Sequence, residues 1–173
     1  MDQEFGVMAL ISRRALAAAS GGLAILGLGS LSTDAKKKNK KKKKKIKPYA
    51  LEAPDMTGEK EVGPNPNAGD LNGSGRADFN VKAQKGSKCQ ICCNIEFSTT
   101  TPNSTISGVH IHQGPAGADG PIVIDFHGSQ ATCVTIDKGL AKALKETPGA
   151  FYANTHTNNF TDGAVRDQLV LKA

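Results

Sequence analysis

Three histidines carry the clearest chemistry in this sequence. His110 and His112 lie two residues apart in the apolar run 106–112, and His156 lies at the end of a second apolar run, 151–156. In a strand, residues i and i+2 share one face and are about 6.5–7 Å apart, so His110 and His112 can be directed at one point. If the later run pairs beside residues 109–112, His156 joins them. Three neutral imidazoles are a ligand set that suits Zn²⁺ or Cu²⁺.

Two other interpretations of these histidines stay open. Histidines on a sheet face often bond to loop backbone, and the glycine-rich loop 114–120 needs such partners. Alternatively Arg166 and Gln168, which share one face of the last predicted strand, bind an anion. With a metal present, the same two side chains would form the layer behind its ligands. The fourth histidine, His127, precedes a Gly-Ser turn and is expected to be a solvated loop residue.

The motifs expected of common enzymes are missing from the sequence. Four histidines are too few for a dinuclear copper/zinc site with its full ligand set. There is no Gly-x-Ser-x-Gly motif and no carboxylate pair in a recognisable arrangement. We therefore expect a protein that is not an enzyme, with weak copper redox chemistry as the one enzymatic alternative. No cofactor is required by the sequence, and zinc and copper are the candidate metals.

Short strands must position these side chains. Apolar residues alternate with polar ones at 77–81 and 91–97, and further apolar runs lie at 51–62, 121–126 and 164–171. One helix is predicted over 137–146, with Asp137 as its N-cap and Pro148-Gly149 after its end. Seven or so strands with one short helix indicate an all-β fold: an antiparallel β-sandwich or Greek-key barrel.

Four cysteines lie in this part of the chain. Strand alternation places Cys89 and Cys93 on the core face with Ile91 and places Cys92 on the opposite face. A bond from this group to Cys133 closes a loop of about 40 residues, worth roughly 4 kcal/mol in the chain-entropy model. We predict a Cys92–Cys133 disulfide, with Cys89 and Cys93 either paired together or free.

Charge divides the chain into a leader and a domain. Of the 22 basic and 16 acidic residues, 12 basic and 3 acidic residues fall in 1–47, so residues 48–173 carry a net charge of −3. This balance gives no electrostatic basis for specific nucleic-acid recognition by the domain. Residues 1–35 have the outline of a signal peptide: Arg13 and Arg14 resemble a twin-arginine signal, an apolar run follows, and cleavage is expected after Ala35. The general secretory route and an uncleaved anchor are the alternatives.

Residues 36–47 contain ten lysines. Such a segment repels itself and is expected to be disordered. It is either an electrostatic tether to an anionic cell-surface polymer or lipid headgroups, or a solubilising spacer. The sequence thus predicts an exported protein, extracellular or held at the cell envelope, of unknown oligomeric state.

Five segments together resemble a CHRD domain, the chordin-type repeat module common in bacterial secreted proteins. They are Thr57–Val62, Gly73–Phe79, His110–Gly117, Phe151–Thr157 and Gly163–Leu169, and the resemblance runs from about Ala50 to Leu171 within a domain of residues 48–173. It implies an immunoglobulin-like β-barrel, distantly similar to copper/zinc superoxide dismutases, with no established activity. The bacterial branch carries cysteines near positions 92 and 133, in agreement with the predicted disulfide. The chain departs from the family pattern at Thr161-Asp162 and Asp167.

Overall fold

Antiparallel strands make up most of the computed structural model, which describes residues 46–63 and 68–173. In chain order the elements are β1 (Tyr49–Thr57), the 3-10 turn η1 (Gly58–Lys60), β2 (Gly73–Ala83), β3 (Lys88–Thr99), β4 (Ile106–Gln113), β5 (Ile122–Asp125), β6 (Ala131–Asp137), α1 (Lys138–Glu146), η2 (Pro148–Ala150), β7 (Phe151–Thr157), β8 (Val165–Gln168) and β9 (Val170–Leu171). In this part of the chain no helix is long and apolar enough to cross a membrane. Arg13, Arg14, Ala35 and most of the lysine segment 36–47 lie outside the described residues.

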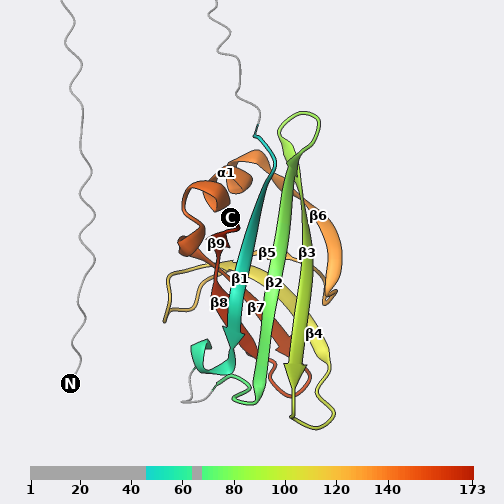
Figure 1. Cartoon of the computed structure of the whole chain (residues 1–173), viewed down its shortest axis with the longest axis vertical. Coiled ribbons are helices and arrows are strands. Elements are labelled where there is room, and N and C mark those ends of the chain that lie inside the picture. The colour runs from blue at the N-terminus through green and yellow to red at the C-terminus, as the bar shows by residue number, and fades with distance from the viewer. Residues whose placement is uncertain (1–45, 64–67) are drawn as a thin grey trace, which may run out of the picture. The chain divides into compact units, whose positions relative to one another are not determined.

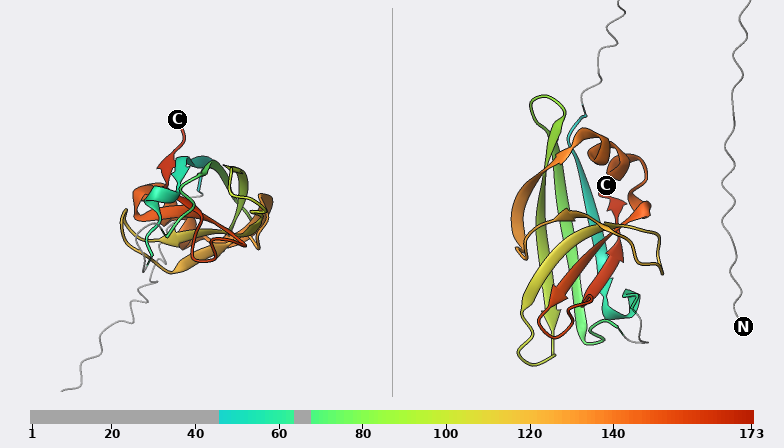
Figure 2. Two further views of the ribbon diagram at one scale, coloured as in Figure 1. Left: turned by 90° about the horizontal axis from the view of Figure 1, so that it is seen from below. Right: turned by 180° about the vertical axis from the view of Figure 1, so that it is seen from behind.

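The strands form one sheet rolled into a nearly closed barrel (Figures 1 and 2). Their order is β5-β4-β7-β8-β1-β2-β3-β6, with β9 paired to β1. The chain thus leaves β3 for the far end of the sheet, builds β4 and β5 there, and returns to place β6 beside β3. Residues 126–130 join the two edges: Phe126 N–H donates to Val109 O at 3.0 Å, and Ile95 N–H donates to Gln130 O at 2.8 Å. The prediction of an all-β fold with one short α-helix is confirmed, in its barrel form.

The two walls of the barrel differ in their strands. β1, β2 and β3 run side by side as long strands at the front of Figure 1, whereas β4, β7 and β8 form the wall that faces the viewer in the right-hand view of Figure 2. Alternation of apolar and polar residues turns one face of each strand inward, as in Ala77, Phe79 and Val81 of β2. Phe79 stacks on Phe126 at 5.7 Å between ring centroids, so the front wall packs against the turn that joins the edges.

Three expectations about local structure need correction. Residues 131–137 form the strand β6, which sequence analysis missed because its side chains, apart from Ile136, are exposed or half-buried. The strand predicted from the alternating residues 77–81 is longer than that run, since β2 already begins at Gly73 and ends at Ala83. Asp137 precedes α1 but makes no side-chain cap bond; its carboxylate instead accepts a hydrogen bond from Lys88 Nζ at 2.8 Å.

The predicted Cys92–Cys133 disulfide is present in the structure and joins neighbouring strands β3 and β6, where the two residues are direct register partners. Cys89 and Cys93 are buried and free, so of the two alternatives left open for them, pairing is wrong. They occupy the inward face of β3 with Ile91, as alternation predicted, and pack as small apolar side chains in the core.

Candidate metal centre

The histidine pair lies on the outer face of β4. Val109 and Ile111 are fully buried in the barrel interior, and the alternation of the strand therefore turns His110 and His112 outward. Neither imidazole is freely solvated: both residues are half-buried, and the side chain of His110 is 15% exposed. The rings lie 5.7 Å apart between centroids in an edge-to-face arrangement. The predicted common face of these two residues is therefore present.

Pairing of β4 with β7 brings in the third histidine. His156 is the register partner of Gly108, and its ring centroid lies 4.8 Å from that of His110 and 6.4 Å from that of His112. A Cβ atom at position 108 would lie 3.0 Å from His110 Cε1 and 3.2 Å from His156 Cδ2. Glycine at this position therefore lets the two rings approach each other. One nitrogen from each of the three rings lies within 4.8 Å of the others.

Each imidazole has one nitrogen beside an acceptor and one without a partner. His112 Nδ1 lies 2.9 Å from Gly120 O, and His156 Nδ1 lies 2.8 Å from Thr161 O. Because a carbonyl oxygen only accepts, both Nδ1 atoms carry a proton, and in the neutral form of each ring the lone pair is on Nε2. His110 is reversed, with Nε2 lying 3.5 Å from the Asp125 carboxylate. The remaining three atoms, His110 Nδ1, His112 Nε2 and His156 Nε2, are buried without a hydrogen-bond partner.

Burial keeps the rings of His110 and His112 uncharged. It lowers the pKa of His110 to about 4, and the neighbouring His156 and His112 lower it further against the attraction of Asp125. Burial also lowers the pKa of His112. Both rings are therefore neutral at pH 7, the form in which imidazole binds a metal. The arrangement can hold a divalent transition metal without first releasing protons from these two ligands.

Arg166 and Gln168 lie on β8 and hold the loop that contacts His112. Arg166 Nη2 donates to Pro115 O and Ala118 O, both at 2.9 Å, and Gln168 Nε2 donates to Gly114 O at 3.0 Å. These bonds fix the loop 114–120, whose Gly120 carbonyl accepts from His112. The two side chains predicted to lie behind the ligands thus reach the histidines through a loop and not by direct contact.

A stack of three side chains crosses the same face. The Arg166 guanidinium carbon lies 3.4 Å from the centroid of the Tyr152 ring, and that ring stacks on His112 at 4.7 Å with an interplanar angle of 12°. Gly120 N–H donates to the Tyr152 hydroxyl at 3.2 Å. Sequence analysis did not select Tyr152, although strand alternation places it on the outer face of β7 with His156.

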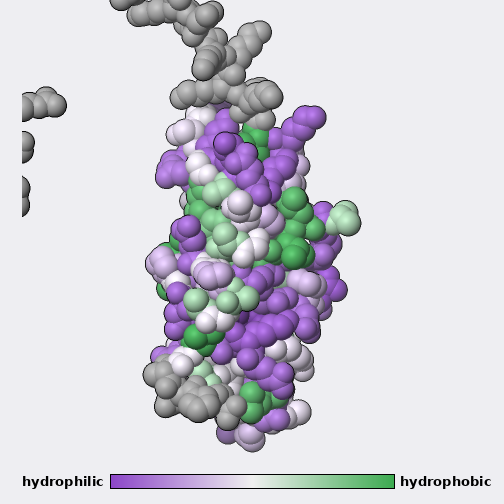
Figure 3. All heavy atoms as spheres, turned by 90° about the vertical axis from the view of Figure 1, so that its left-hand side faces the viewer, coloured by the Kyte–Doolittle hydropathy of each residue, from purple (hydrophilic) through white to green (hydrophobic). Residues whose placement is uncertain are grey.

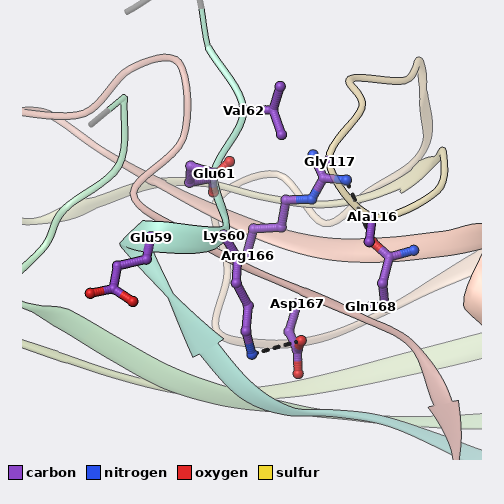
Figure 4. A pocket seen from close by; sticks show the side chains of 9 residues that line it. All are labelled: Glu59, Lys60, Glu61, Val62, Ala116, Gly117, Arg166, Asp167 and Gln168. Atoms are coloured by element: carbon purple, nitrogen blue, oxygen red, sulfur yellow. Dashed lines mark hydrogen bonds and ion pairs between the residues drawn. The ribbon is translucent and has the colours of Figure 1, made fainter. Parts of the chain in front are cut away.

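A half-buried carboxyl group, also missed, lies beside this stack. Figure 4 shows the 330 Å³ pocket where Glu61, Arg166 and the loop around Gly117 come together. Glu61 Oε1 accepts from Asn154 Nδ2 at 2.9 Å, and burial raises the pKa of Glu61 to about 8 against the opposing effects of Arg166 and Asn154. In the same pocket the Lys60 ammonium lies 3.0 Å from Asp167, one of the positions that depart from the family pattern.

A second pocket, of 450 Å³, opens over the histidines. It is lined by side chains and backbone from three loops and from β4 and β7: Val62, Gly63, His112, Asp119, Gly120, Tyr152, Asn154, His156, Thr161 and Asp162. His127 lies outside it and is 79% exposed, as expected of a solvated loop residue.

The fold and this site define an all-β barrel module with a cluster of buried polar side chains on one outer wall. The sequence pattern of the CHRD domain matches residues 53–169, and the chain therefore belongs to the CHRD family. Domains of this family are typically extracellular, and the disulfide is consistent with export. No curated protein and no solved structure was found to be similar to the chain.

Proposed function

We propose that this protein is an exported CHRD module that acts by binding and not by catalysis. The barrel interior is filled with apolar side chains, whereas the outer wall of β4, β7 and β8 buries polar groups beneath three loops. Buried polar groups without partners are costly, and a bound ligand relieves that cost. The three unpartnered ring nitrogens carry the proposal, since they support the choice of this wall as the binding surface.

The ligand that this geometry favours is a divalent transition metal, zinc or copper, held by His110, His112 and His156. A tetrahedral zinc ion with bonds of about 2.0–2.1 Å brings its nitrogen ligands closer together than the 4.8 Å within which these atoms lie. A small inward shift of the rings therefore brings all three nitrogens to bonding distance of one ion. Gly120 O, Thr161 O and Asp125 hold the opposite nitrogens, as carbonyl and carboxylate groups do behind metal-bound histidines.

Thermal unfolding of the full chain with and without zinc or copper tests this proposal. A ligand that binds only the native state stabilises that state by about 2.7 kcal/mol when the free ligand concentration is 100 times its Kd. The wild type should therefore unfold at higher temperature with metal, and His156→Ala should lose the shift. His127→Ala is the matched control, because it removes an exposed histidine outside the cluster and should keep the shift. A metal response that is equal in all three proteins would contradict the site.

The lysine segment 36–47 provides the second part of the proposal, as a tether to an anionic cell-surface polymer or to lipid headgroups. Its support comes from sequence alone: ten lysines follow the predicted export signal. Exposed charges are screened within about 8 Å at physiological salt, so this binding should weaken steeply as salt rises. Binding of the full chain to anionic vesicles should disappear on deletion of residues 36–47. Binding that survives both the deletion and high salt would exclude the tether.

A further inference from the structure

The three histidines leave a metal ion one ligand short of the four that zinc commonly takes. Within residues 46–63 and 68–173, no fourth His, Cys, Asp or Glu side chain joins the group. The 450 Å³ pocket is lined by two of the three ligands, His112 and His156. An outside molecule in this pocket would therefore lie beside two of the three proposed ligands, where it could supply the fourth.

The lining of this pocket selects for positive charge and hydrogen-bond donors. Asp119 and Asp162 contribute exposed carboxylates from two different loops. Asn154, only 3% exposed, also lines the pocket, and its Oδ1 has no partner while its Nδ2 is held by Glu61. The nearest strong cation, Arg166, is 1% exposed, and its Nη1 lies 3.8 Å from Asp119. Among the residues that line the pocket, the exposed charged groups are therefore the two carboxylates.

Scattered apolar surface offers no competing site. The large exposed apolar side chains of the described residues are Leu71, Ile122, Val170 and Leu171. On the face drawn in Figure 3, hydrophobic residues lie in small groups between hydrophilic ones. Apolar residues spread in this way are usual on a protein surface. Polar recognition at the metal centre is the stronger basis for a ligand.

We propose that the metal takes its fourth ligand from outside the chain, as a neutral nitrogen donor carried by a positively charged molecule. The chemical class is an amine or imidazole of a basic peptide or small cation. This inference rests on the proposed metal centre. The donor nitrogen would bind the metal, while the positive group would lie against Asp119 and Asp162.

Three pyridines with the same donor nitrogen and different charge test the inference. They are 4-(aminomethyl)pyridine, which is a cation at neutral pH, uncharged 4-methylpyridine, and the anion isonicotinate. Their para substituents cannot chelate the metal to which the ring nitrogen is bound. The full chain is loaded with Co²⁺, whose d–d absorption first reports binding to the three histidines and then shifts when a pyridine joins.

The cation should bind most tightly and the anion least, with about a two- to fivefold step at each change of charge, because exposed ion pairs are weak. The double variant Asp119→Asn/Asp162→Asn should remove this order. Asp137→Asn, an equally exposed carboxylate on the far strand β6, should keep it.

The outcomes separate the two claims. If no cobalt spectrum develops, the metal centre itself is wrong and the inference falls with it. A cobalt spectrum that no pyridine changes would leave the centre in place and overturn the outside ligand. An affinity order independent of charge, or unchanged in the double variant, would overturn the cationic class.

Discussion

β3 and β7 illustrate two ways of using a strand in one barrel. In β3 buried residues alternate with less buried ones from Cys89 to Ile95, so the strand serves the apolar interior alone. In β7 every residue except His156 is buried, on both faces. The inner face of β7 packs in the core, and its outer face lies beneath the loops that hold Glu61, Gly120 and Thr161. A wall buried on both sides, with polar groups on the outer side, forms a second, polar layer, and this layer is where we propose that the ligand binds.

The two walls should differ most in how much stability is lost when an arginine in each is replaced by methionine. Arg166 is buried in the polar layer, where it bonds two carbonyls and stacks on Tyr152. Arg166→Met should lower the free energy of unfolding by about 3 kcal/mol, because it breaks a buried charged network. Arg76, on β2, is 49% exposed and pairs only with Asp78. Arg76→Met should cost less than about 1 kcal/mol. The two variants are compared by denaturant unfolding. Equal shifts of their midpoints would contradict the difference between the two walls.

Removing the disulfide tests whether the strands that it joins, β3 and β6, are independent of the strands β4 and β7, which carry the histidines. Cys92→Ser/Cys133→Ser should lower the free energy of unfolding by about 2–4 kcal/mol. Metal affinity should not change, since the bond fastens β3 to β6 and the histidines lie on β4 and β7. Reductant should destabilise the wild type and leave the double variant unaffected. A parallel loss of metal binding would show that the walls are coupled.

Glu61 gives the polar layer a pH dependence of its own. Its carboxyl ionises near 4.5 when unfolded, but its pKa is raised to about 8 in the fold. Between these values the folded state holds the extra proton, so this contribution is complete below pH 4.5 and is lost as pH rises to 8. Glu61→Gln removes the titration and should gain stability over the wild type by about 1–3 kcal/mol across this interval. If the wild type and Glu61→Gln had parallel stability profiles from pH 4.5 to 8, the raised pKa of Glu61 would be contradicted.

The smallest expected effect on stability is at Gly108, where a substitution should change metal affinity but not the fold. Gly108→Ala places a methyl group between His110 and His156 and should weaken metal binding about tenfold, as a displaced ligand does. The fold should be nearly unaffected, since a small shift of ring edges accommodates the methyl group. Gly139→Ala in α1 meets no atom within 4 Å and is the matched control, with unchanged metal affinity. Metal affinity is measured by competition with a chromophoric chelator.

Much of this organisation could be predicted from the sequence, and the reasons are local. Alternation alone places His110, His112 and Cys92 on the correct faces, because strand period is exact. It does not show which strands pair, and convergence of His156 depended on β4 lying beside β7. The strand β6 was missed because an edge strand with one buried side chain has little pattern.

The polar layer itself was the hardest part to foresee. Glu61 lies in a 3-10 turn region about a hundred residues from Arg166 and Asn154, and no periodicity connects them. Tyr152 and Asn154 share the outer face with His156 and could have been found by the same alternation. Their burial depends on loops folding back over the sheet, which is a tertiary event.

Metal content tests the central claim most directly. The full chain, isolated without chelators or metal-binding tags, is measured by elemental mass spectrometry beside His110→Ala, His156→Ala and the exposed-histidine control His127→Ala. The account predicts close to one zinc or copper ion per chain in the wild type and in His127→Ala, and none in the other two. Absence of metal from every protein, even after incubation with zinc and copper, would contradict the centre and leave the three histidines as loop-binding residues of the barrel.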